Sequence, residues 1–507
     1  MNASSRRAPT VGVLPASACP SLRIEVEPVE RWTTRIGDLR VEDGAVFADL
    51  FAGPATTGGT ALTLLLSLQS GGWLALRDHV QSEVGFPSLR EALPAAGWYE
   101  REVFERYGLA ARGNPHLQPL GYSSGAAGGA DLFDGQPLGA APPGVVDYPL
   151  GPVRSGIVES GHYTIRTVGE EIVDLRLQLA YKHRGIEELA ITVEPAFVPL
   201  LAERISGTDA VAHGLAASQA LEQLAGRAVP PRATAIRTVA AEIERLHNHA
   251  GFQADLCAAT GLSVGQAQFE IVRERLLRLA ARIAGHRYLF GLVLPGGVAS
   301  DLDDAACADI VDTVSGARAA TVELGRLIRT SGSHMDRLLA TGQVMASDAV
   351  SLALTGPVGR AAGVDIDARR DHSYEAYGRL AVPVPIREAG DAAARMEVRL
   401  DESLASADLI LELVGRLPDG PAVVADPLAP TVLRPDSIGL GWAEGSRGTE
   451  LHWLETDASG RLSRYRVRSA SFACWQAFAQ CVPGTNILTD FPIIEQSFGL
   501  SFAGADR

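Results

Sequence analysis

Apolar and polar residues alternate over residues 22–26, a pattern that predicts a β-strand with one buried face. Prolines interrupt the residues before it, so we expect a disordered tail over residues 1–20. Short apolar runs further along predict more strands of the same sheet, separated by helices, at 46–51, 61–68 and 73–76. We therefore expect a small α+β unit over residues 21–120.

A segment rich in Gly, Ala, Ser and Pro follows this unit. Residues 121–147 contain almost no periodic apolar positions, which is typical of a flexible linker between domains. Beyond the linker, alternating apolar residues predict a β-hairpin at 163–179. Apolar residues at helical spacing predict two long helices, at 236–246 and 269–283. The second unit, residues 148–507, is therefore expected to be mainly α-helical with small β elements, and the fold class of the whole chain is α+β.

The composition is that of a globular protein. Of the 507 residues, 46% are hydrophobic and 21% are charged, which supplies enough apolar material for sizeable cores. The net charge of −15 argues against a surface that binds nucleic acid or anionic lipid. No apolar run approaches the ~20 residues of a membrane-spanning helix, so we expect membrane contact only through partner proteins.

Cysteines are few and scattered along the chain, and none forms a C-x-x-C motif. A sparse, odd set of this kind fits a reducing compartment. It also supplies no compact motif for a four-cysteine iron–sulfur or zinc site. Any redox cofactor is therefore expected in another protein.

Two charged clusters lie among apolar residues between positions 181 and 213. If both clusters lie on helices, Arg184 and Glu187 share one face at i, i+3, and Asp209 and His213 share another at i, i+4. Such clusters occur as ion pairs on exposed helices. They also occur in buried sites, where carboxylates beside arginines have shifted pKa values and pass protons. The pattern alone leaves both interpretations open.

The clusters resemble two signatures of nickel–iron hydrogenase large subunits. The sequence RGIEE at 184–188 resembles their RGxE motif, and RISGTDAVAH at 204–213 resembles R-x-C-G-x-C-x-x-x-H. Ser206 and Asp209 stand at the two cysteine positions. The frame of the motif is therefore kept, while two of its metal ligands are replaced.

The second pair of ligands in these hydrogenases comes from a D-P-C-x-x-C motif near the C-terminus. Alignment on Asp506 and Arg507 places Ser501 and Gly504 at those cysteine positions. Nickel and iron in such a site need soft thiolates, whereas hydroxyl and carboxylate oxygens are hard donors and glycine offers no ligand atom. The resemblance therefore implies a hydrogenase-like pocket without a bound metal.

Other segments resemble subunits of respiratory complex I. Residues 98–120, WYEREVFERYGLAARGNPHLQPL, resemble the signature of the 30-kilodalton subunit. Residues 151–190 resemble the start of the 49-kilodalton subunit and, more closely, of the large subunit of formate hydrogenlyase and hydrogenase-4, which are group 4 nickel–iron hydrogenases. The resemblance implies a 30-kilodalton-like domain over 21–120 that is fused to a 49-kilodalton-like domain over 148–507.

The resemblance implies a subunit of a membrane-associated oxidoreductase complex. Such a complex would couple electron transfer, from NADH or another donor to quinone, to ion translocation. The implied partners are an iron–sulfur small subunit like the 20-kilodalton subunit of complex I, which would hold the clusters, and membrane subunits like proton pumps. The chain itself would hold no cofactor, bind no nucleic acid, and be cytoplasmic and peripheral to the inner membrane.

One alternative is a quinone or other small-molecule reductase with an altered pocket, and two functions of other classes are also compatible with the same motifs. The first is a redox-inert scaffold that transmits conformational change within an ion-translocating complex. The second is an active hydrogenase, which needs thiolate ligands that the motifs lack. These two functions differ from the main interpretation in whether electrons reach the pocket and in whether a metal receives them.

The resemblance also implies roles for particular residues. In the 49-kilodalton family a hairpin histidine approaches the quinone headgroup; His162 is the nearest match, and His183 and Ser206 belong to the same quinone-pocket-like region. The implied catalytic residues, with Arg204 as a counter-charge for the carboxylates, are Glu187, His213, Asp209, Arg204 and Arg184. The alternative role for His162 is a turn histidine hydrogen-bonded to the backbone. The alternative role for the charged residues is a buried ion-pair network that keeps the pocket open.

Overall fold

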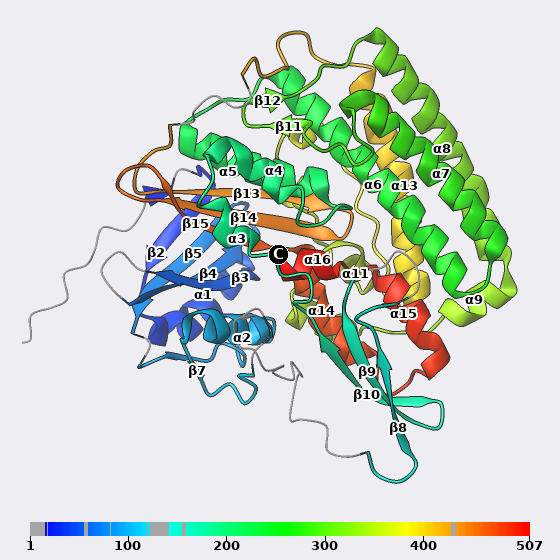
Figure 1. Ribbon diagram of the computed structural model, residues 1–507, viewed down its shortest axis with the longest axis horizontal. Helices are drawn as coiled ribbons and strands as arrows, with labels where there is room; N and C mark the ends of the chain where they lie inside the picture. Colours follow the sequence, from blue (N-terminus) through cyan, green and yellow to red (C-terminus); the bar gives the residue numbers. More distant parts are fainter. Residues whose placement is uncertain are drawn as a thin grey trace, which may run out of the picture.

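The computed structural model describes residues 16–17, 19–54, 59–81, 83–118, 120–121, 141–154, 159–426 and 432–507. Nearly all of the predicted tail and most of the predicted linker lie outside the described residues. Helices and strands are mixed along the chain, so the predicted α+β class is confirmed (Figure 1). Within the described part, no helix is both long enough and apolar enough to cross a membrane.

The N-terminal unit is a four-stranded sheet with two helices on one face (Figure 1). The strand order is β2-β5-β4-β3, in which β2 runs parallel to β5 and the other neighbours are antiparallel. The predicted apolar runs are confirmed as strands. The bounds of the elements are β2 Leu22–Val26, α1 Trp32–Asp43, β3 Val46–Pro54, β4 Thr60–Ser67, β5 Trp73–Val80 and α2 Ala96–Tyr107.

Both faces of this sheet are buried, which explains why its strands are nearly continuous apolar runs. Leu64 and Leu66 belong to the core that contains α1 and α2. Leu65, between them, points to the opposite face and belongs with Phe51 to the core of the second unit. The sheet is therefore a layer between its own helices and the rest of the molecule.

A second sheet stacks against that opposite face. Phe51 and Trp453 contact each other across the two layers, with ring centroids 5.3 Å apart. Helix α5 covers the other side of the second sheet, so closely that a β-carbon added at Gly441 would lie 1.8 Å from the Ala216 carbonyl oxygen. The elements are β1 Ala16–Ser17, α5 Ala210–Ala225, β13 Ser437–Gly445, β14 Gly448–Thr456 and β15 Leu462–Arg468, in the order β1-β13-β14-β15.

The longest helices form a bundle beside the sheets (Figure 1). Helix α6 begins at Pro231, where the missing N–H of proline costs no hydrogen bond. Asp303 and Asp391 cap the next helices by accepting backbone N–H bonds of 2.8 Å each. The helices predicted at 236–246 and 269–283 are confirmed, as parts of α6 and α7. The bundle consists of α6 Pro231–Ala259, α7 Ser263–Ala284, α8 Asp304–Thr330 and α13 Ala392–Val414.

The predicted hairpin is confirmed, and a third strand extends it into a small antiparallel sheet that projects from the body (Figure 1). The predicted linker, residues 121–147, extends too far, because residues 145–147 begin this third strand. They do so because they pair with β9, Val145 opposite Val168. The strands are β8 Val145–Leu150, β9 His162–Val168 and β10 Glu171–Gln178.

Short elements connect these layers. The C-terminus lies near the centre of the molecule, where Arg184 N donates to the Arg507 carbonyl oxygen at 2.9 Å (Figure 1). The connecting elements are β6 Phe86–Pro87, β7 Ala111–Arg112, α3 Ile186–Ala190, α4 Val198–Ala202, β11 Val293–Leu294, β12 Gly297–Val298, α9 Gly332–Leu338, α10 Ala346–Ser351, α11 Gly356–Ala361, α12 Ala368–Asp371, α14 Ala470–Cys481, α15 Phe491–Phe498 and α16 Phe502–Asp506.

A layer of buried ion pairs joins the N-terminal unit to the second sheet. Arg466 of β15 donates two bonds of 2.9 Å to Asp49 of β3 and contacts Glu102 of α2 at 2.6 Å. Nearby, Arg77 of β5 pairs with Glu455 of β14 at 3.1 Å. These side chains are buried, so each charge depends on its partner to offset the loss of solvation. The two units are therefore held in one relative position by specific pairs.

Cleavage between the units is expected to leave them bound to each other. The predicted linker has a composition rich in Gly, Ala, Ser and Pro, and on that ground we expect a protease to cut there first. The two fragments should then co-elute in gel filtration, because the ion-pair layer and the stacked sheets do not depend on the covalent connection. Wild-type fragments that separate without denaturant would contradict this expectation.

The substitution Arg466→Met tests the contribution of the layer. It leaves Asp49 buried without a counter-charge, which should cost about 3–5 kcal/mol of unfolding free energy and allow the cleaved fragments to separate. Arg461→Met, at an exposed arginine before β15, is the matched control and should change neither result.

Candidate functional site

The predicted ligand positions come from two distant segments that meet at one place. Ser206 precedes α5, and Asp209 is the N-cap residue of that helix. Ser501 is the N-cap residue of α16, and Gly504 lies within it. A β-carbon added at Gly504 would lie 3.8 Å from Ser206 Cβ and 3.2 Å from Ser501 Oγ. The structure thus brings the four positions together.

The side-chain oxygens at these positions bond to protein groups. Ser206 Oγ donates to Asp209 Oδ2 at 3.2 Å. Ser501 Oγ accepts from Gly504 N at 2.8 Å and donates to the Glu159 carboxylate at 2.9 Å. Because Ser206, Asp209 and Ser501 are all buried, this is an enclosed polar cluster and not a solvated surface.

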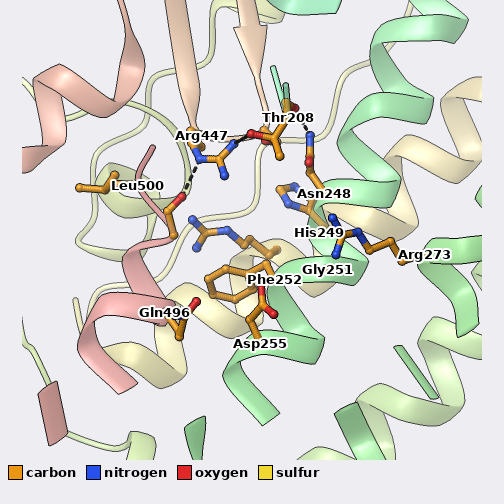
Figure 2. A pocket seen from close by; sticks show the side chains of 13 residues that line it. Thr208, Asn248, His249, Gly251, Phe252, Asp255, Arg273, Arg447, Gln496 and Leu500 are labelled. Carbon is orange, nitrogen blue, oxygen red and sulfur yellow. Dashed lines mark hydrogen bonds between the residues drawn. The ribbon is translucent and has the colours of Figure 1, made fainter. Parts of the chain in front are cut away.

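Arg447 is the cation of this cluster (Figure 2). It lies in the tight turn between β13 and β14 and donates to Thr208 Oγ1 at 2.7 Å and to Asp209 Oδ2 at 2.8 Å. Its Nε donates to the Gly499 carbonyl oxygen at 2.6 Å. Burial favours the neutral acid, but Arg447 and the neighbouring hydrogen bonds hold the pKa of Asp209 below its ordinary value. The site therefore contains an ion pair whose carboxylate is buried and whose guanidinium is partly exposed.

Arg447 is not among the residues predicted from the sequence, although its turn carries a recognisable signal. Gly-Ser-Arg-Gly at 445–448 separates two strands, and Gly445 pairs with Gly448 across the hairpin. A two-residue loop beside glycine is typical of a β-hairpin. The contact with Asp209 is not visible in the sequence, because 238 residues separate the two side chains.

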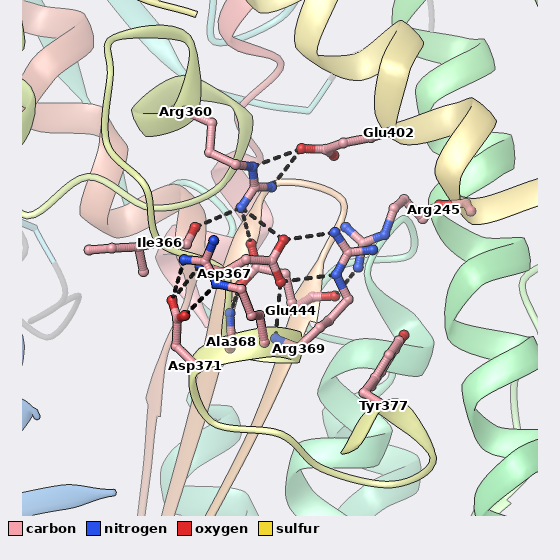
Figure 3. A network of polar contacts seen from close by, with 12 residues as sticks. Arg245, Arg360, Ile366, Asp367, Ala368, Arg369, Asp371, Tyr377, Glu402 and Glu444 are labelled. Carbon is pink, nitrogen blue, oxygen red and sulfur yellow. Dashed lines mark hydrogen bonds and ion pairs between the residues drawn. The ribbon is translucent and has the colours of Figure 1, made fainter. Parts of the chain in front are cut away.

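A network of buried arginines and carboxylates supports this turn (Figure 3). Arg245 of α6 donates to the carbonyl oxygens of Glu444 and Gly445 at 2.5 and 2.7 Å. Arg360 pairs with Glu402 of α13 at 2.8 Å and with Glu444 at 2.9 Å. The network fixes the end of β13 and thereby the position of the next residues, including Arg447.

Glu187 lies in a separate ion cluster, on α3. Its carboxylate contacts the Arg106 guanidinium, lies 3.5 Å from Arg507 and 3.8 Å from Arg466, and accepts a bond of 2.8 Å from Val467 N. Burial opposes ionisation, yet the three guanidiniums lower the pKa of Glu187. The carboxylate is therefore held in its ionised form between the N-terminal unit and β15.

The predicted helix face shared by Arg184 and Glu187 is wrong. Arg184 precedes α3, and the N-cap Gly185 has a left-handed backbone with φ of 63°, so helical spacing does not apply. The Arg184 guanidinium donates instead to the carbonyl oxygens of Arg204 and Ile205, at 2.7 and 2.8 Å. Arg184 therefore ties the end of α4 to the loop before α3.

The predicted role of Arg204 as a counter-charge for Glu187 or Asp209 is also wrong. Its side chain is 53% exposed and pairs with Glu203 at 3.6 Å. Its guanidinium lies over the ring of Phe290, 5.2 Å from the centroid. The carboxylates of Glu187 and Asp209 are paired by arginines of other elements, which a local sequence pattern does not reveal.

His213 belongs to a buried line of hydrogen-bonding groups. Its Nδ1 lies 3.0 Å from His452 Nε2, and His452 Nδ1 lies 2.6 Å from the Tyr465 hydroxyl. Its Nε2 lies 3.7 Å from the Glu450 carboxylate. Burial lowers the pKa of His213 to about 4 and that of His452 well below its ordinary value, so both imidazoles are neutral near pH 7. Tyr465 lines the same small cavity as Glu187.

The two predicted quinone-pocket histidines make backbone contacts. His162 Nδ1 lies 3.0 Å from the Gly151 carbonyl oxygen. His183, in the turn before α3, has its Nδ1 2.7 Å from the Asp506 carbonyl oxygen. This contact of His162 fits the alternative prediction for it, a turn histidine that is hydrogen-bonded to the backbone. Of the predicted pocket residues, Ser206 is the one that lies in the Arg447–Asp209 cluster.

Comparison with known proteins agrees with this architecture. Residues 45–138 match the family described as the respiratory-chain NADH dehydrogenase 30 Kd subunit, and residues 259–436 match the 49 Kd subunit family. The chain is 31% identical to formate hydrogenlyase subunit 5 of Escherichia coli K12 over 475 residues, which cover 89% of this chain and 82% of the relative. It is 29% identical to hydrogenase-4 component G of the same strain, with 86% and 78% of the two chains covered.

A solved structure supports the same relationship. It is described as the membrane-bound sulfane sulfur reductase, an archaeal respiratory membrane complex, and one of its chains matches with 25% identity and a TM-score of 0.68. The match covers 72% of this chain and 98% of the other. The chain therefore belongs to the family of complex-I-like and hydrogenase-like large subunits that includes formate hydrogenlyase subunit 5, with a 30-kilodalton-type domain fused to a 49-kilodalton-type domain.

Proposed function

We propose that this chain is a subunit of a membrane-associated, complex-I-like oxidoreductase that works without a nickel–iron site. The proposal rests on the side chains at the four positions that resemble the metal-ligand positions of hydrogenases and that meet at one place in the structure. Ser206, Asp209, Ser501 and Gly504 supply no thiolate, and the Asp209 carboxylate is paired with Arg447.

This donor set does not fit nickel and iron. Soft thiolates hold those metals in the hydrogenases that the motifs resemble, whereas serine hydroxyls stay protonated near neutral pH. A guanidinium at 2.8 Å from the remaining carboxylate also repels a metal cation. Among the described residues, no three His, Cys, Asp or Glu side chains are grouped so that they would hold a metal ion.

We further propose the partners that an electron-transferring subunit of this family needs. An iron–sulfur small subunit would hold the clusters, and membrane subunits like proton pumps would translocate the ion. Support comes from the relatives, which are named as parts of formate hydrogenlyase, hydrogenase-4 and an archaeal respiratory membrane complex. In this proposal the chain is cytoplasmic and peripheral to the membrane, and electrons pass from NADH or another donor to quinone or another small oxidant.

For the proton that accompanies electron transfer, we assign a role to His213 rather than to Glu187. The Glu187 carboxylate stays ionised beside three guanidiniums, which disfavours proton uptake near pH 7. His213 and His452, in contrast, are neutral imidazoles in one hydrogen-bonded line. An imidazole accepts a proton at one ring nitrogen while the other releases one, so such a line passes protons through a buried region.

A redox-inert scaffold is the second candidate function, and one observation favours it. Glu187, Arg106, Arg466 and Arg507 join α2, α3, β15 and the C-terminal residue in one ion cluster. A cluster that connects both units transmits a displacement of one to the other without any electron transfer. The two candidates differ in what they require of His452.

The purified complex is expected to contain no stoichiometric nickel and to evolve no hydrogen from a reduced artificial donor. The reason is that the four converging positions offer no thiolate. Elemental analysis of the complex together with a hydrogen assay measures both quantities. One nickel atom per chain would contradict the proposal.

The substitution His452→Gln is expected to slow ion translocation in membrane vesicles at least tenfold while the complex still assembles on a native gel. Glutamine keeps hydrogen-bonding groups but does not exchange a proton between two ring nitrogens, and acid–base groups contribute about 10²–10⁴-fold to rate. His286→Gln, the same change at an exposed histidine outside this hydrogen-bonded line, is the matched control and should leave translocation unchanged.

Glu187→Gln separates the two candidates further. If Glu187 only pairs with arginines, replacing its carboxylate with the glutamine amide should lower stability or assembly. The translocation rate per assembled complex should then stay near the wild-type value. Slow translocation by a fully assembled Glu187→Gln complex would return the proton-carrying role to this residue. Normal translocation by His452→Gln would instead favour the scaffold.

A further inference from the structure

A cavity of about 140 Å³ lies beside the Arg447–Asp209 pair (Figure 2). Three arginines from three different elements line it: Arg273 of α7, Arg399 of α13 and Arg447 of the β13–β14 turn. The cavity shares residues with a wider cleft of about 1340 Å³, so it has a route to solvent. A cavity of this volume has room for several waters or one small polyatomic ion.

We propose that this cavity binds a small oxyanion, held by the guanidiniums of Arg273, Arg399 and Arg447. The proposal does not depend on the oxidoreductase function and applies equally to a scaffold. Planar guanidiniums suit oxyanions because their parallel N–H groups match two oxygens of a carboxylate, sulfate or phosphate.

The first argument is the charge balance around Arg399. This residue is 2% exposed, and among the described residues its guanidinium forms no ion pair; Glu402, on the same helix, acts on it electrostatically but is paired with Arg360. Its guanidinium donates to the carbonyl oxygens of Ser497 and Phe498, at 3.2 and 2.9 Å, and stacks on Phe252 at 3.8 Å. These contacts explain it as a cap of α15, but they supply no negative charge. A buried cation of this kind is stabilised by an anion.

The second argument is an unsatisfied donor. Arg273 Nε is buried and has no hydrogen-bond partner in the described part of the chain. The side chain lies against α6 at Gly251, where an added β-carbon would be 3.2 Å from Nε, so glycine leaves room for it there. In Figure 2 the Arg273 side chain extends toward the cavity from the side opposite Gln496. A buried N–H without a partner is costly, and an anion in the cavity would satisfy it.

The net charge of the side chains that line the cavity also favours an anion. Asp255 is the carboxylate that lines the cavity, and Asp209 lies next to it in a pair with Arg447. Among the side chains that line the cavity, three guanidiniums therefore face one carboxylate, which leaves a net positive charge on the lining. The proposed ligand is thus anionic and small, and it would bind directly beside the cluster that replaces the metal ligands.

Isothermal titration of the full-length chain with sodium sulfate, sodium phosphate and sodium acetate, each at constant ionic strength with chloride, tests the proposal. We expect saturable binding of at least one of these anions. Arg273→Gln should weaken it about tenfold or more, since a hydrogen bond to a charged group contributes about 1.5–3 kcal/mol. Arg326→Gln, at an exposed arginine of α8 outside the cavity, is the matched control and should bind like the wild type.

The variant Arg399→Lys gives a second test, because it keeps the positive charge but removes the planar guanidinium. It should also weaken the binding, and its thermal unfolding in chloride shows whether the cap of α15 survives. The absence of saturable binding for all three anions would overturn the proposal. Equal binding by wild type and Arg273→Gln would overturn it as well, because the ion would then bind elsewhere.

Discussion

Pairing of buried charge is the constraint on which the rest of this molecule depends. Arg466 lies between Asp49 and Glu102, and Arg360 lies between Glu402 and Glu444, all of them buried. A charge in such a position destabilises the fold unless its partner is present. The partners come from different layers, so these pairs fix how the N-terminal sheet, the second sheet and the helical bundle meet.

The same constraint shapes the candidate site. Two segments that resemble the metal-binding motifs of hydrogenases still meet, but Arg447 now pairs with Asp209 where thiolates would be expected. Arg245 holds the backbone of that turn from α6. The groups at these positions are hard oxygens and a guanidinium, and in the function that we propose they suit protons and anions better than nickel.

Much of the fold could be predicted from local patterns. The strands β3 to β5, the β9–β10 hairpin and helices α6 and α7 follow from apolar runs, alternation and helical spacing, and the convergence of Ser206 with Gly504 follows from the resemblance. The partners of the charged residues could not be predicted. Glu187 pairs with Arg106 and Arg507 instead of the neighbouring Arg184, because Gly185 interrupts the helix that would have aligned them.

A double-mutant cycle on Asp209 and Arg447 tests the central claim most directly, namely that this pair has replaced a metal as the link between the two motif segments. The unfolding free energy of the full-length chain is measured by denaturant titration for Asp209→Asn, Arg447→Gln and the double variant. Arg447→Gln should cost about 3–5 kcal/mol, because it leaves the buried Asp209 carboxylate without a counter-charge, and Asp209→Asn should cost less, because Arg447 is partly exposed. The double variant should cost little more than Arg447→Gln. Additive effects of the two substitutions would contradict the account.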